Sequence, residues 1–407
     1  MNLTRRSVIS AAAGTAWAAT SPRLNVALAA GATSNIVVVV FLRGGSDSLQ
    51  MVAPSGDANY IAARPNLRVP SSGPGAGLGL GSMASVDFYL HPSLPELKAL
   101  YDAKKLAVVH ATGVLTEDRS HFTCQDIMER GSADSEPGLS TGWLARHLNS
   151  IGSGTAALSA ISVAPAINTA LVGDAAATAI ANTESFSARG GEPNSNVIRA
   201  IVAGGSTAYD AAARRTLDDV AAVQSALSAA GSTGRSTGAP TNGYTNGELS
   251  SSLKSLAALI KANVGVVAAT VDMGGWDHHQ ALVAGYQERG TELSRSLNAF
   301  WSDLSGFQGR LTLVTMTEFG RRLQENANQG LDHGSASVML AMGAGVNGGK
   351  LYGTWPGLAA QQLHGGDLKV TTDNRQVLAE LVVKRHAESS VAAVFPTLKY
   401  APVGVFS

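Results

Sequence analysis

Several short segments of this 407-residue chain combine carboxylates with imidazoles, the side chains that most often bind metal ions in proteins. Asp277-His278-His279 is the densest of them, and Asp332-His333 is a second carboxylate–imidazole pair. Because mixed oxygen and nitrogen donors suit hard-to-borderline cations, these segments predict a site for a divalent ion such as zinc, manganese or calcium. The alternative for each segment is an ordinary turn with exposed side chains. The predicted ligands, two of them from other segments, are Asp47, Asp277, His278, His279, Glu318, Asp332 and His333.

A hydroxyl and an imidazole are adjacent at Ser120-His121, where the pattern predicts the start of a helix. The positive end of the helix dipole suits a nucleophile or an anion, which makes Ser120 with His121 a candidate catalytic pair; the alternative is that Ser120 or Asp118 only caps the helix. His121 or His278 is the best candidate for general acid–base catalysis, because histidine titrates near neutral pH. Arg321, an arginine at the end of a predicted strand, suits binding of an oxyanion, and Arg43 is a second candidate for this role.

Apolar runs that we expect to be strands precede most of these polar segments. Ile36–Leu42 is a continuous run that stops at Arg43-Gly44-Gly45, and runs that are apolar on both faces are typical of strands buried in a parallel sheet. The alternation of strands and helices predicts an α/β sandwich with a mainly parallel sheet, in which ligands bind beyond the carboxyl ends of the strands. The other predicted strands are 106–111, 265–271, 311–317 and 338–342, and the predicted helices are 94–101, 196–229 and 282–304.

The overall composition excludes several classes of protein. Lys and Arg together number 30, and Asp and Glu also number 30, so the chain lacks the excess positive charge of a nucleic-acid binder. Hydrophobic residues make up 45% of the chain, which is enough for a large core. Cys124 is the only cysteine, which excludes an intramolecular disulfide and a zinc site built from several thiolates. After the N-terminal segment, no apolar run reaches the length of about 20 residues that a membrane span requires.

Residues 1–30 have the pattern of a removable export signal. Arg5-Arg6 precedes a weakly apolar, alanine-rich stretch, and small residues allow cleavage after Ala29. Paired arginines before such a stretch resemble a twin-arginine signal, which predicts a periplasmic or secreted protein; a Sec signal and a mitochondrial presequence are the alternatives. We expect residues 31–407 to form a single domain with an insertion at about 187–249.

With these motifs in order, the chain resembles the DUF1501 family, a bacterial group whose members often carry twin-arginine signals. The resemblance covers nearly the whole chain after the signal segment. The family is similar to the alkaline phosphatase and sulfatase superfamily, so the resemblance implies an α/β/α sandwich, alkaline phosphatase-like, with metal bound at the strand ends. It rests on Phe41–Asp47, Tyr60, Arg64-Pro65, His91-Pro92, Arg119–Phe122, Gly275–His279, Thr317–Arg321, Asp332–Gly334, Tyr352-Gly353 and Trp355-Pro356.

That superfamily binds one or two divalent cations through Asp and His, and its nucleophile is a Ser, Thr or formylglycine at a helix N-terminus. The resemblance therefore implies an exported metal-dependent hydrolase whose substrate is an anionic phosphate or sulfate ester. Two departures are Glu318-Phe319 in place of an Asp-His pair, and the lack of the Cys/Ser-x-Pro-x-Arg sulfatase signature around Ser120. The matching residues, in chain order, are Asp47, Ser120 or Thr123, Asp277 with His279, Glu318 and His333.

Two other functions remain open from the sequence. The first is a serine esterase with Ser48 as nucleophile, because Ser46–Leu49 is similar to the Gly-Asp-Ser-Leu motif of such enzymes. Against it, Ser46 replaces the leading glycine, and the downstream Asp-x-x-His partner is not evident. The second is a non-catalytic secreted binding or assembly protein, stabilised by metal, with a degenerate superfamily site. The sequence identifies no protein or polysaccharide partner.

Overall fold

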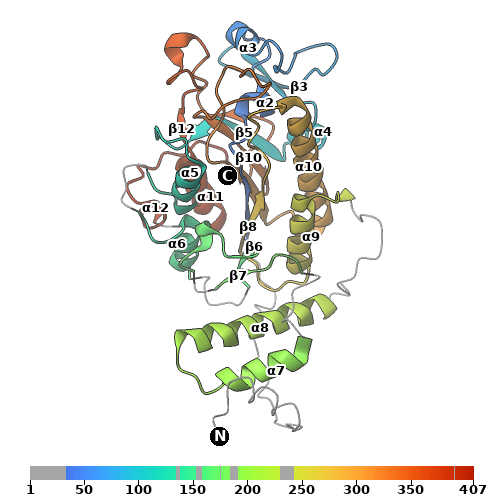
Figure 1. Cartoon of the computed structure of the whole chain (residues 1–407), viewed down its shortest axis with the longest axis vertical. Coiled ribbons are helices and arrows are strands. Elements are labelled where there is room, and N and C mark those ends of the chain that lie inside the picture. Colours follow the sequence, from blue (N-terminus) through green and yellow to red (C-terminus); the bar gives the residue numbers. More distant parts are fainter. Residues whose placement is uncertain are drawn as a thin grey trace.

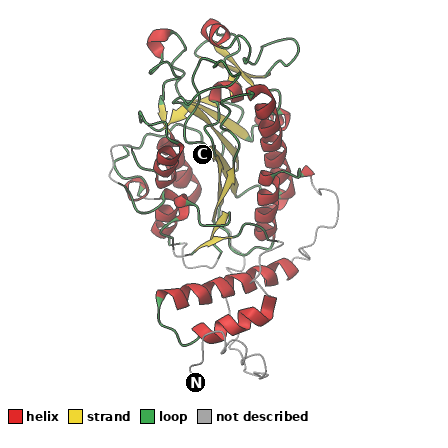
Figure 2. Ribbon diagram, viewed as in Figure 1, coloured by secondary structure: helices red, strands yellow, loops and turns green. Residues whose placement is uncertain are grey.

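The computed structural model describes residues 34–133, 138–152, 158–174, 176–183, 191–229, 243–388 and 390–407. The predicted signal at residues 1–30 lies outside the described residues, as does part of the predicted insertion. Strands and helices of the described ranges form a three-layered body with a separate pair of helices at one end (Figure 2). Within these ranges, no helix combines the length and the apolar character that a membrane span requires.

The main sheet has nine strands in the described part of the chain, in the order β11-β5-β10-β9-β1-β8-β6-β7, and β12 also pairs with β5. β10 pairs antiparallel with β5 and with β9, and all other pairings are parallel. The expected mainly parallel sheet is therefore confirmed. Its strands are β1 (Ile36–Leu42), β5 (Leu106–Gly113), β6 (Ala160–Val163), β7 (Ala177–Ala179), β8 (Ala268–Met273), β9 (Leu311–Met316), β10 (Ser337–Gly343), β11 (Leu351–Tyr352) and β12 (Thr372–Asp373).

β1 is the central strand of this sheet, and its side chains enter two separate cores. Val38, Val40 and Leu42 belong to one hydrophobic cluster, whereas Val39 and Phe41 belong to the other. Side chains alternate between the two faces of a strand, so a strand covered on both faces must be apolar throughout. This requirement explains the continuous apolar run that the sequence shows.

Helices cover both faces of the sheet (Figure 1). Helices on one face pack into the hydrophobic cluster that contains Val38, and helices on the other face pack into the cluster that contains Val39. The expected α/β/α sandwich is thus confirmed. The first face has α4 (Pro95–Asp102), α9 (Glu248–Lys261) and α10 (Leu282–Asp303), and the second has α5 (His121–Arg130), α6 (Trp143–Ser150), α11 (Asn374–His386) and α12 (Val391–Val394).

A small antiparallel sheet follows the carboxyl end of β1 and has the strand order β2-β4-β3. This sheet leaves little signal in the sequence, because its strands are short and β3 contains two glycines. The elements of this region are α2 (Ser48–Met51), β2 (Val52–Ala53), α3 (Ala58–Ala63), β3 (Leu78–Met83) and β4 (Val86–Leu90). Single-turn helices elsewhere are η2 (Thr169–Leu171), η4 (Ser305–Phe307) and η5 (Ala360–Gln362).

Two helices, α7 (Gly191–Val202) and α8 (Ala208–Ala229), occupy the region for which one helix at 196–229 is predicted. That prediction is wrong, because Gly204-Gly205 separates the two helices and glycine disfavours a helix interior. The pair lies at the end of the molecule opposite α3 (Figure 1). The Oγ1 atom of Thr178 in β7 donates to Asp219 in α8 at 3.0 Å, which connects the pair to the sheet.

Candidate metal centre

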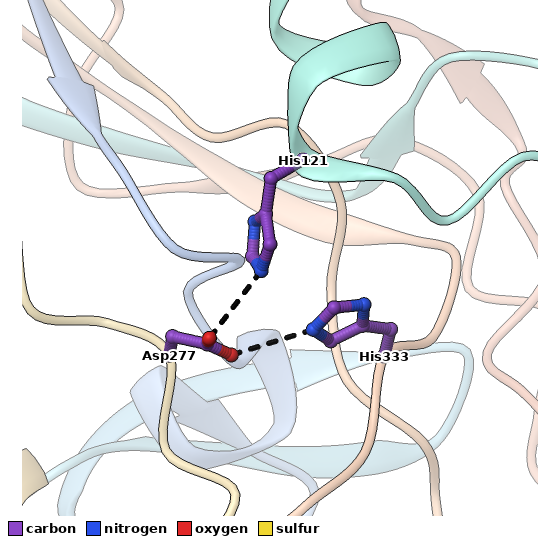
Figure 3. Close-up of side chains that lie close together, drawn as sticks. All are labelled: His121, Asp277 and His333. Carbon is purple, nitrogen blue, oxygen red and sulfur yellow. Dashed lines mark hydrogen bonds and ion pairs between the residues drawn. The ribbon is translucent and has the colours of Figure 1, made fainter.

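Three side chains from distant parts of the sequence converge at one edge of the main sheet (Figure 3). His121 is the first residue of α5, which follows β5, while Asp277 follows β8 and His333 precedes β10. Because β10 is antiparallel, its start lies at the same edge as the carboxyl ends of β5 and β8. One potential ligand atom of each residue lies within 4.8 Å of the other two, so the three could hold one metal ion.

A fourth side chain, His279, joins this group. Its Nε2 atom lies 2.9 Å from Nε2 of His333 and 3.1 Å from Oδ1 of Asp277. Oδ1 of Asp277 is also 3.3 Å from Nε2 of His333, and its Oδ2 is 3.5 Å from Nε2 of His121. Donors bound at about 2.1 Å to a tetrahedral ion are about 3.4 Å apart, which is close to the distances around Asp277. The group whose donor atoms all lie within 4.8 Å of one another is His121, Asp277 and His333, and His279 lies beside two of them. The four side chains form the histidine–aspartate cluster.

Hydrogen bonds to the Nδ1 atoms decide which ring nitrogens carry protons. Nδ1 of His333 lies 2.9 Å from the main-chain oxygen of Arg119, an acceptor that requires a proton on Nδ1. Nδ1 of His121 faces Oε1 of Glu318 at 2.7 Å in the same way. In a neutral imidazole with its proton on Nδ1, the Nε2 atom has a lone pair and no proton, which is the form that binds a metal ion. Burial lowers the pKa of His333, so this ring is neutral at neutral pH.

His279 is oriented by Asp332. Nδ1 of His279 lies 3.1 Å from Oδ1 of Asp332, which also accepts a hydrogen bond from Asn326 at 3.1 Å. The hydrogen bonds from Asn326 and His279 lower the pKa of Asp332. Asp332, which was predicted to bind the ion itself, therefore contacts Nδ1 of His279, the ring nitrogen that faces away from the cluster. With protons on both Nδ1 atoms, Nε2 of His279 and Nε2 of His333 would meet as two lone pairs at 2.9 Å, a repulsive contact that a nearby cation relieves. Nη1 of Arg321 lies 3.4 Å from Nε2 of His279, and a bound metal ion would provide a second positive charge here.

The cluster also contains a polar atom that a metal ion would satisfy. Nε2 of His121 is buried and makes no hydrogen bond within the described part of the chain. Its contact with Oδ2 of Asp277, at 3.5 Å, is long, and a buried polar atom without a hydrogen bond is costly, which favours a ligand at this position. Three imidazole nitrogens and one carboxylate oxygen suit the tetrahedral coordination of zinc. They suit calcium less well, because calcium takes about six to eight oxygen ligands.

Arg321 supports Asp277 from within the protein. Its side chain is 1% exposed, and its Nη2 donates to Oδ1 of Asp277 at 2.6 Å and to the main-chain oxygen of Gly44. Its Nε donates to Gly45 at 2.8 Å, and its Nη1 donates to Leu331 at 3.0 Å. Partial burial alone would raise the pKa of Asp277, but the hydrogen bond and charge of Arg321 outweigh burial and lower it. These contacts do not support the predicted role of Arg321 in binding the substrate anion.

Arg43 is likewise paired within the protein. Its Nη2 lies 2.6 Å from Oε1 of Glu129, and its Nε lies 2.9 Å from Oδ2 of Asp272, so the predicted role of Arg43 in anion binding gains no support. The adjacent Gly44 has a φ of +117°, and a Cβ atom there would lie 2.6 Å from the main-chain nitrogen of Asp277. Glycine is therefore required because the turn packs against the loop that carries Asp277.

Glu318 lies behind His121 instead of among the ligands. Its Oε1 accepts hydrogen bonds from Gln125 at 2.8 Å and from the main-chain nitrogen of Gly44 at 2.9 Å, besides that from His121. Burial alone would raise the pKa of Glu318, but these hydrogen bonds outweigh burial and lower it. A carboxylate in this position fixes the orientation of a ligating imidazole and increases its basicity. The structure therefore gives Glu318 a supporting place rather than the predicted place of a ligand.

Asp47 lies apart from the cluster, in a buried salt bridge. Both of its oxygens pair with Arg64, and the two side chains are 1% and 0% exposed. Oδ1 also accepts from the main-chain nitrogen of Leu49 at 3.3 Å and so caps α2. These contacts do not support the prediction that Asp47 binds the ion. The neighbouring Ser48, the nucleophile of the esterase alternative, is fully buried and donates to the main-chain oxygen of Ala336 at 3.2 Å.

His278 and Ser120 complete the predicted set. The His278 ring packs on the α10 side of its loop, with its centroid 6.1 Å from that of Tyr286 and 6.3 Å from that of Trp276. Its neighbour His279 is the one that joins the cluster. Ser120 is the N-cap residue of α5, is half-buried, and makes no capping hydrogen bond with its side chain. Its position next to His121 is compatible with the predicted role as nucleophile.

Three residues that support the cluster were missed by the sequence analysis. Gln125 donates to Glu318, Arg119 provides a main-chain oxygen, and Asp367 pairs with the side chain of Arg119. Gln125 could have been found, because it lies four residues after His121 and so on the same face of the predicted helix. A main-chain oxygen and a single carboxylate in a loop have no comparable signal in the sequence.

Comparisons with known proteins identify the family of this chain. The C-terminal periplasmic domain of EcEptC from Escherichia coli, in complex with Zn, is 10% identical with a TM-score of 0.34, covering 75% of this chain and 72% of that chain. Alkaline phosphatase from the Antarctic bacterium TAB5 is 11% identical with a TM-score of 0.26, covering 75% and 91% respectively. Similarities this distant carry no argument about function. No curated protein matches the chain. A family profile described as "Protein of unknown function (DUF1501)" matches residues 116–380, more than half of the chain, which therefore belongs to the DUF1501 family.

Proposed function

We propose that this protein is a metal-dependent hydrolase of phosphate or sulfate esters, centred on the histidine–aspartate cluster. The observation that carries the proposal is the convergence of three imidazole Nε2 atoms on one carboxylate, with each ring fixed through Nδ1. Such a set of donors binds zinc-like ions. A bound ion of this kind supplies Lewis-acid polarisation of an ester and lowers the pKa of a hydroxyl or water beside it.

Ser120 is the proposed nucleophile, because it is the N-cap residue of α5 and its hydroxyl does not cap the helix. The first amides of this 10-residue helix present partial positive charge to an anionic ester. In-line attack by Ser120 Oγ on phosphorus or sulfur would form a bond to Oγ while the bond to the alcohol oxygen of the ester breaks, and the proton lost by Ser120 would leave with the alcohol. Water would then hydrolyse the seryl ester, which releases phosphate or sulfate and regenerates Ser120. His121 serves as a ligand in this proposal and not as the acid or base, since its Nδ1 is bonded to Glu318 and its Nε2 faces Asp277.

The test compares metal content and hydrolysis in the full-length protein and two variants. Elemental analysis measures bound zinc, and para-nitrophenyl phosphate, its diester and para-nitrophenyl sulfate are the substrates. We expect about one ion per chain and hydrolysis of at least one ester. His333→Asn should lose both, whereas Ser120→Ala should keep the ion and lose hydrolysis. A zinc-loaded wild type that leaves all three esters intact contradicts the hydrolase, and retained zinc in His333→Asn contradicts the centre.

A non-catalytic, metal-stabilised binding protein is the second candidate. Two observations favour it: His279 lies beside the three grouped donors, where it would occupy a fourth position on the ion, and Arg43 and Arg321 are paired within the protein. Substitution of Co²⁺ for the native ion separates the two functions. Visible absorption that changes on addition of phosphate supports the hydrolase, because it requires an open position on the ion. An unchanged spectrum, together with a higher melting temperature, supports the binding protein.

We also infer that residues 1–30 direct export by the twin-arginine route, as Arg5-Arg6 and the alanine-rich stretch suggest. Replacement of both arginines by lysine tests this inference in a bacterial host that has the pathway. We expect the precursor to accumulate in the cytoplasm, whereas the wild-type protein is processed and exported. Normal processing of the double-lysine variant would contradict this route and favour a Sec signal.

A further inference from the structure

Asp367 is a fully buried carboxylate that contacts the segments around the cluster but not the cluster itself. Its Oδ2 accepts from Nη2 of Arg119 and lies 3.4 Å from the hydroxyl of Ser335. Its Oδ1 lies 3.2 Å from Nε of Arg322. A carboxylate this deeply buried needs paired charges, and the two arginines provide them. Arg119 comes shortly before His121 in the chain, so Asp367 anchors one of the segments that deliver the ligands.

Arg119 is held at both ends. Its Nη2 donates to Asp367 and to the hydroxyl of Ser335 at 3.2 Å. Its main-chain oxygen lies 2.9 Å from Nδ1 of His333. Because this oxygen can only accept, it keeps the proton of His333 on Nδ1 and leaves the lone pair of Nε2 toward the cluster. Displacement of Arg119 would release the His333 ring to adopt the other tautomer.

The turn that carries Asp367 has a defined conformation. The main-chain nitrogen of His364 donates to the main-chain oxygen of Asp367 at 2.9 Å, and the main-chain nitrogen of Asp367 donates to the main-chain oxygen of His364 at 3.0 Å. Gly365 and Gly366 have φ values of +58° and +89°, which glycine adopts without steric cost in a tight two-residue turn. The Leu368 main-chain oxygen accepts from Ala336 at 3.1 Å, which joins the turn to the segment that leads into β10. Asp367 is therefore fixed relative to the sheet.

We propose that Asp367 is a positioning residue of the metal centre: through Arg119 it fixes the oxygen that sets the tautomer of His333. The inference rests on the metal-binding part of the proposed function. Asp367 then controls metal affinity without contact with the ion. A residue that only stabilised the fold would change the free energy of unfolding, but neither the tautomer of His333 nor the affinity for zinc.

The first experiment measures zinc affinity by competition with a chromophoric chelator. Asp367→Asn and Arg119→Met should each bind zinc about 10–100-fold more weakly than the wild type. The double variant should bind no more weakly than the weaker single variant, because both substitutions break the same connection. The control is Glu388→Gln, a buried carboxylate 3.0 Å from His147 and with no role in the cluster. The proposal would be overturned if the losses of zinc affinity in the two single variants added up in the double variant. It would also be overturned if Glu388→Gln lost as much zinc affinity as Asp367→Asn.

The second experiment uses metal-free protein and long-range proton–nitrogen NMR spectra of the histidine rings. The wild type should show His333 with its proton on Nδ1, and Asp367→Asn should show a larger fraction with the proton on Nε2. Arg119→Met covers the case in which Asp367→Asn does not fold, since the Arg119 side chain is 31% exposed. A wild type that binds no zinc refutes the metal centre. The tautomer of His333, measured in metal-free protein, then still tests whether Asp367 positions this ring. A tautomer that is unchanged in the variants overturns the role of Asp367.

Discussion

Oε1 of Glu318 lies 2.7 Å from Nδ1 of His121, and the same oxygen accepts a hydrogen bond from the main-chain nitrogen of Gly44 at 2.9 Å. The first contact connects the loop after β9 with the start of α5, and the second connects that loop with the turn after β1. One buried carboxylate thus joins three segments at the edge of the sheet and orients one ring of the histidine–aspartate cluster.

Glu318→Gln removes the negative charge behind His121 but keeps an oxygen that accepts the Nδ1 proton. We expect zinc affinity to fall about 10-fold, as the charge of a carboxylate increases the basicity of the ligating ring. Glu318→Met, which also removes the acceptor, should approach a loss of about 100-fold. Competition titrations measure both values, and equal affinity in the wild type and the two variants would contradict the supporting role of Glu318.

His278 and His279 are adjacent in the sequence and provide a matched pair of substitutions. His279→Asn should lower zinc affinity by at least about 100-fold, because a side chain that binds the ion directly is lost. His278→Asn should leave the affinity within about twofold of the wild type, since the ring packs beside Tyr286. Elemental analysis after dialysis against a weak chelator measures retention of the ion. A large loss of affinity in His278→Asn with little change in His279→Asn would show that His278, and not His279, binds the ion.

Asp47→Asn tests whether Asp47 belongs to the salt bridge or to the metal site. The substitution leaves the charge of Arg64 buried without its partner, so the free energy of unfolding should fall by about 3–5 kcal/mol. Urea unfolding of metal-free protein measures this change. The folded variant should bind zinc as the wild type does. Lost zinc binding with unchanged stability would restore Asp47 as a ligand.

The stability of the protein should depend on pH through His110, a fully buried residue of β5. Its Nε2 lies 3.0 Å from the main-chain oxygen of Val52, and its Nδ1 accepts from Ala111 at 2.8 Å, an arrangement that fits a neutral ring. Burial lowers the pKa of His110 from 6.5 to about 4. Below pH 6.5 the unfolded chain therefore gains a proton that the folded chain does not.

The contribution of His110 is fully present above pH 6.5 and is lost as the pH falls toward 4. The difference between the two pKa values corresponds to a loss of about 3 kcal/mol at the acid end. Urea unfolding across this pH range, with a chelator present, gives the free energy of unfolding of the wild type and of His110→Gln. The variant should lose less stability on acidification. Parallel curves for the two proteins would show that His110 does not titrate in this way.

The main elements could be predicted where burial leaves a strong pattern. The run Ile36–Leu42 is apolar on both faces, and the structure has β1 at the same residues. The strand Leu78–Met83 was missed because it is partly exposed and contains two glycines, so no alternation marks it. The break between α7 and α8 was overlooked although Gly204-Gly205 is a recognisable signal, since the apolar residues on both sides continue a helical spacing.

The types of residue in the cluster could be predicted, whereas the place of each side chain could not. Asp277, His279 and His333, predicted as ligands, lie together, and His121, predicted as an acid or base, lies with them. Asp47 has the same chemistry as Asp277, but it pairs with Arg64, which the packing of α3 brings to it from elsewhere in the chain. Partner choice of this kind depends on tertiary contacts, which neither residue type nor spacing encodes.

β10 runs antiparallel to β9, so the chain leaves the sheet at Met316 and re-enters it at Ser337 on the same edge. The intervening residues 317–336 include Glu318 and His333. One residue of the histidine–aspartate cluster, His333, and three residues that contact the cluster, Glu318, Arg321 and Asp332, thus lie in one contiguous segment with both ends anchored in neighbouring strands. Exchange of this segment between members of the family would alter the contacts of the cluster, while the strands on either side stay as they are.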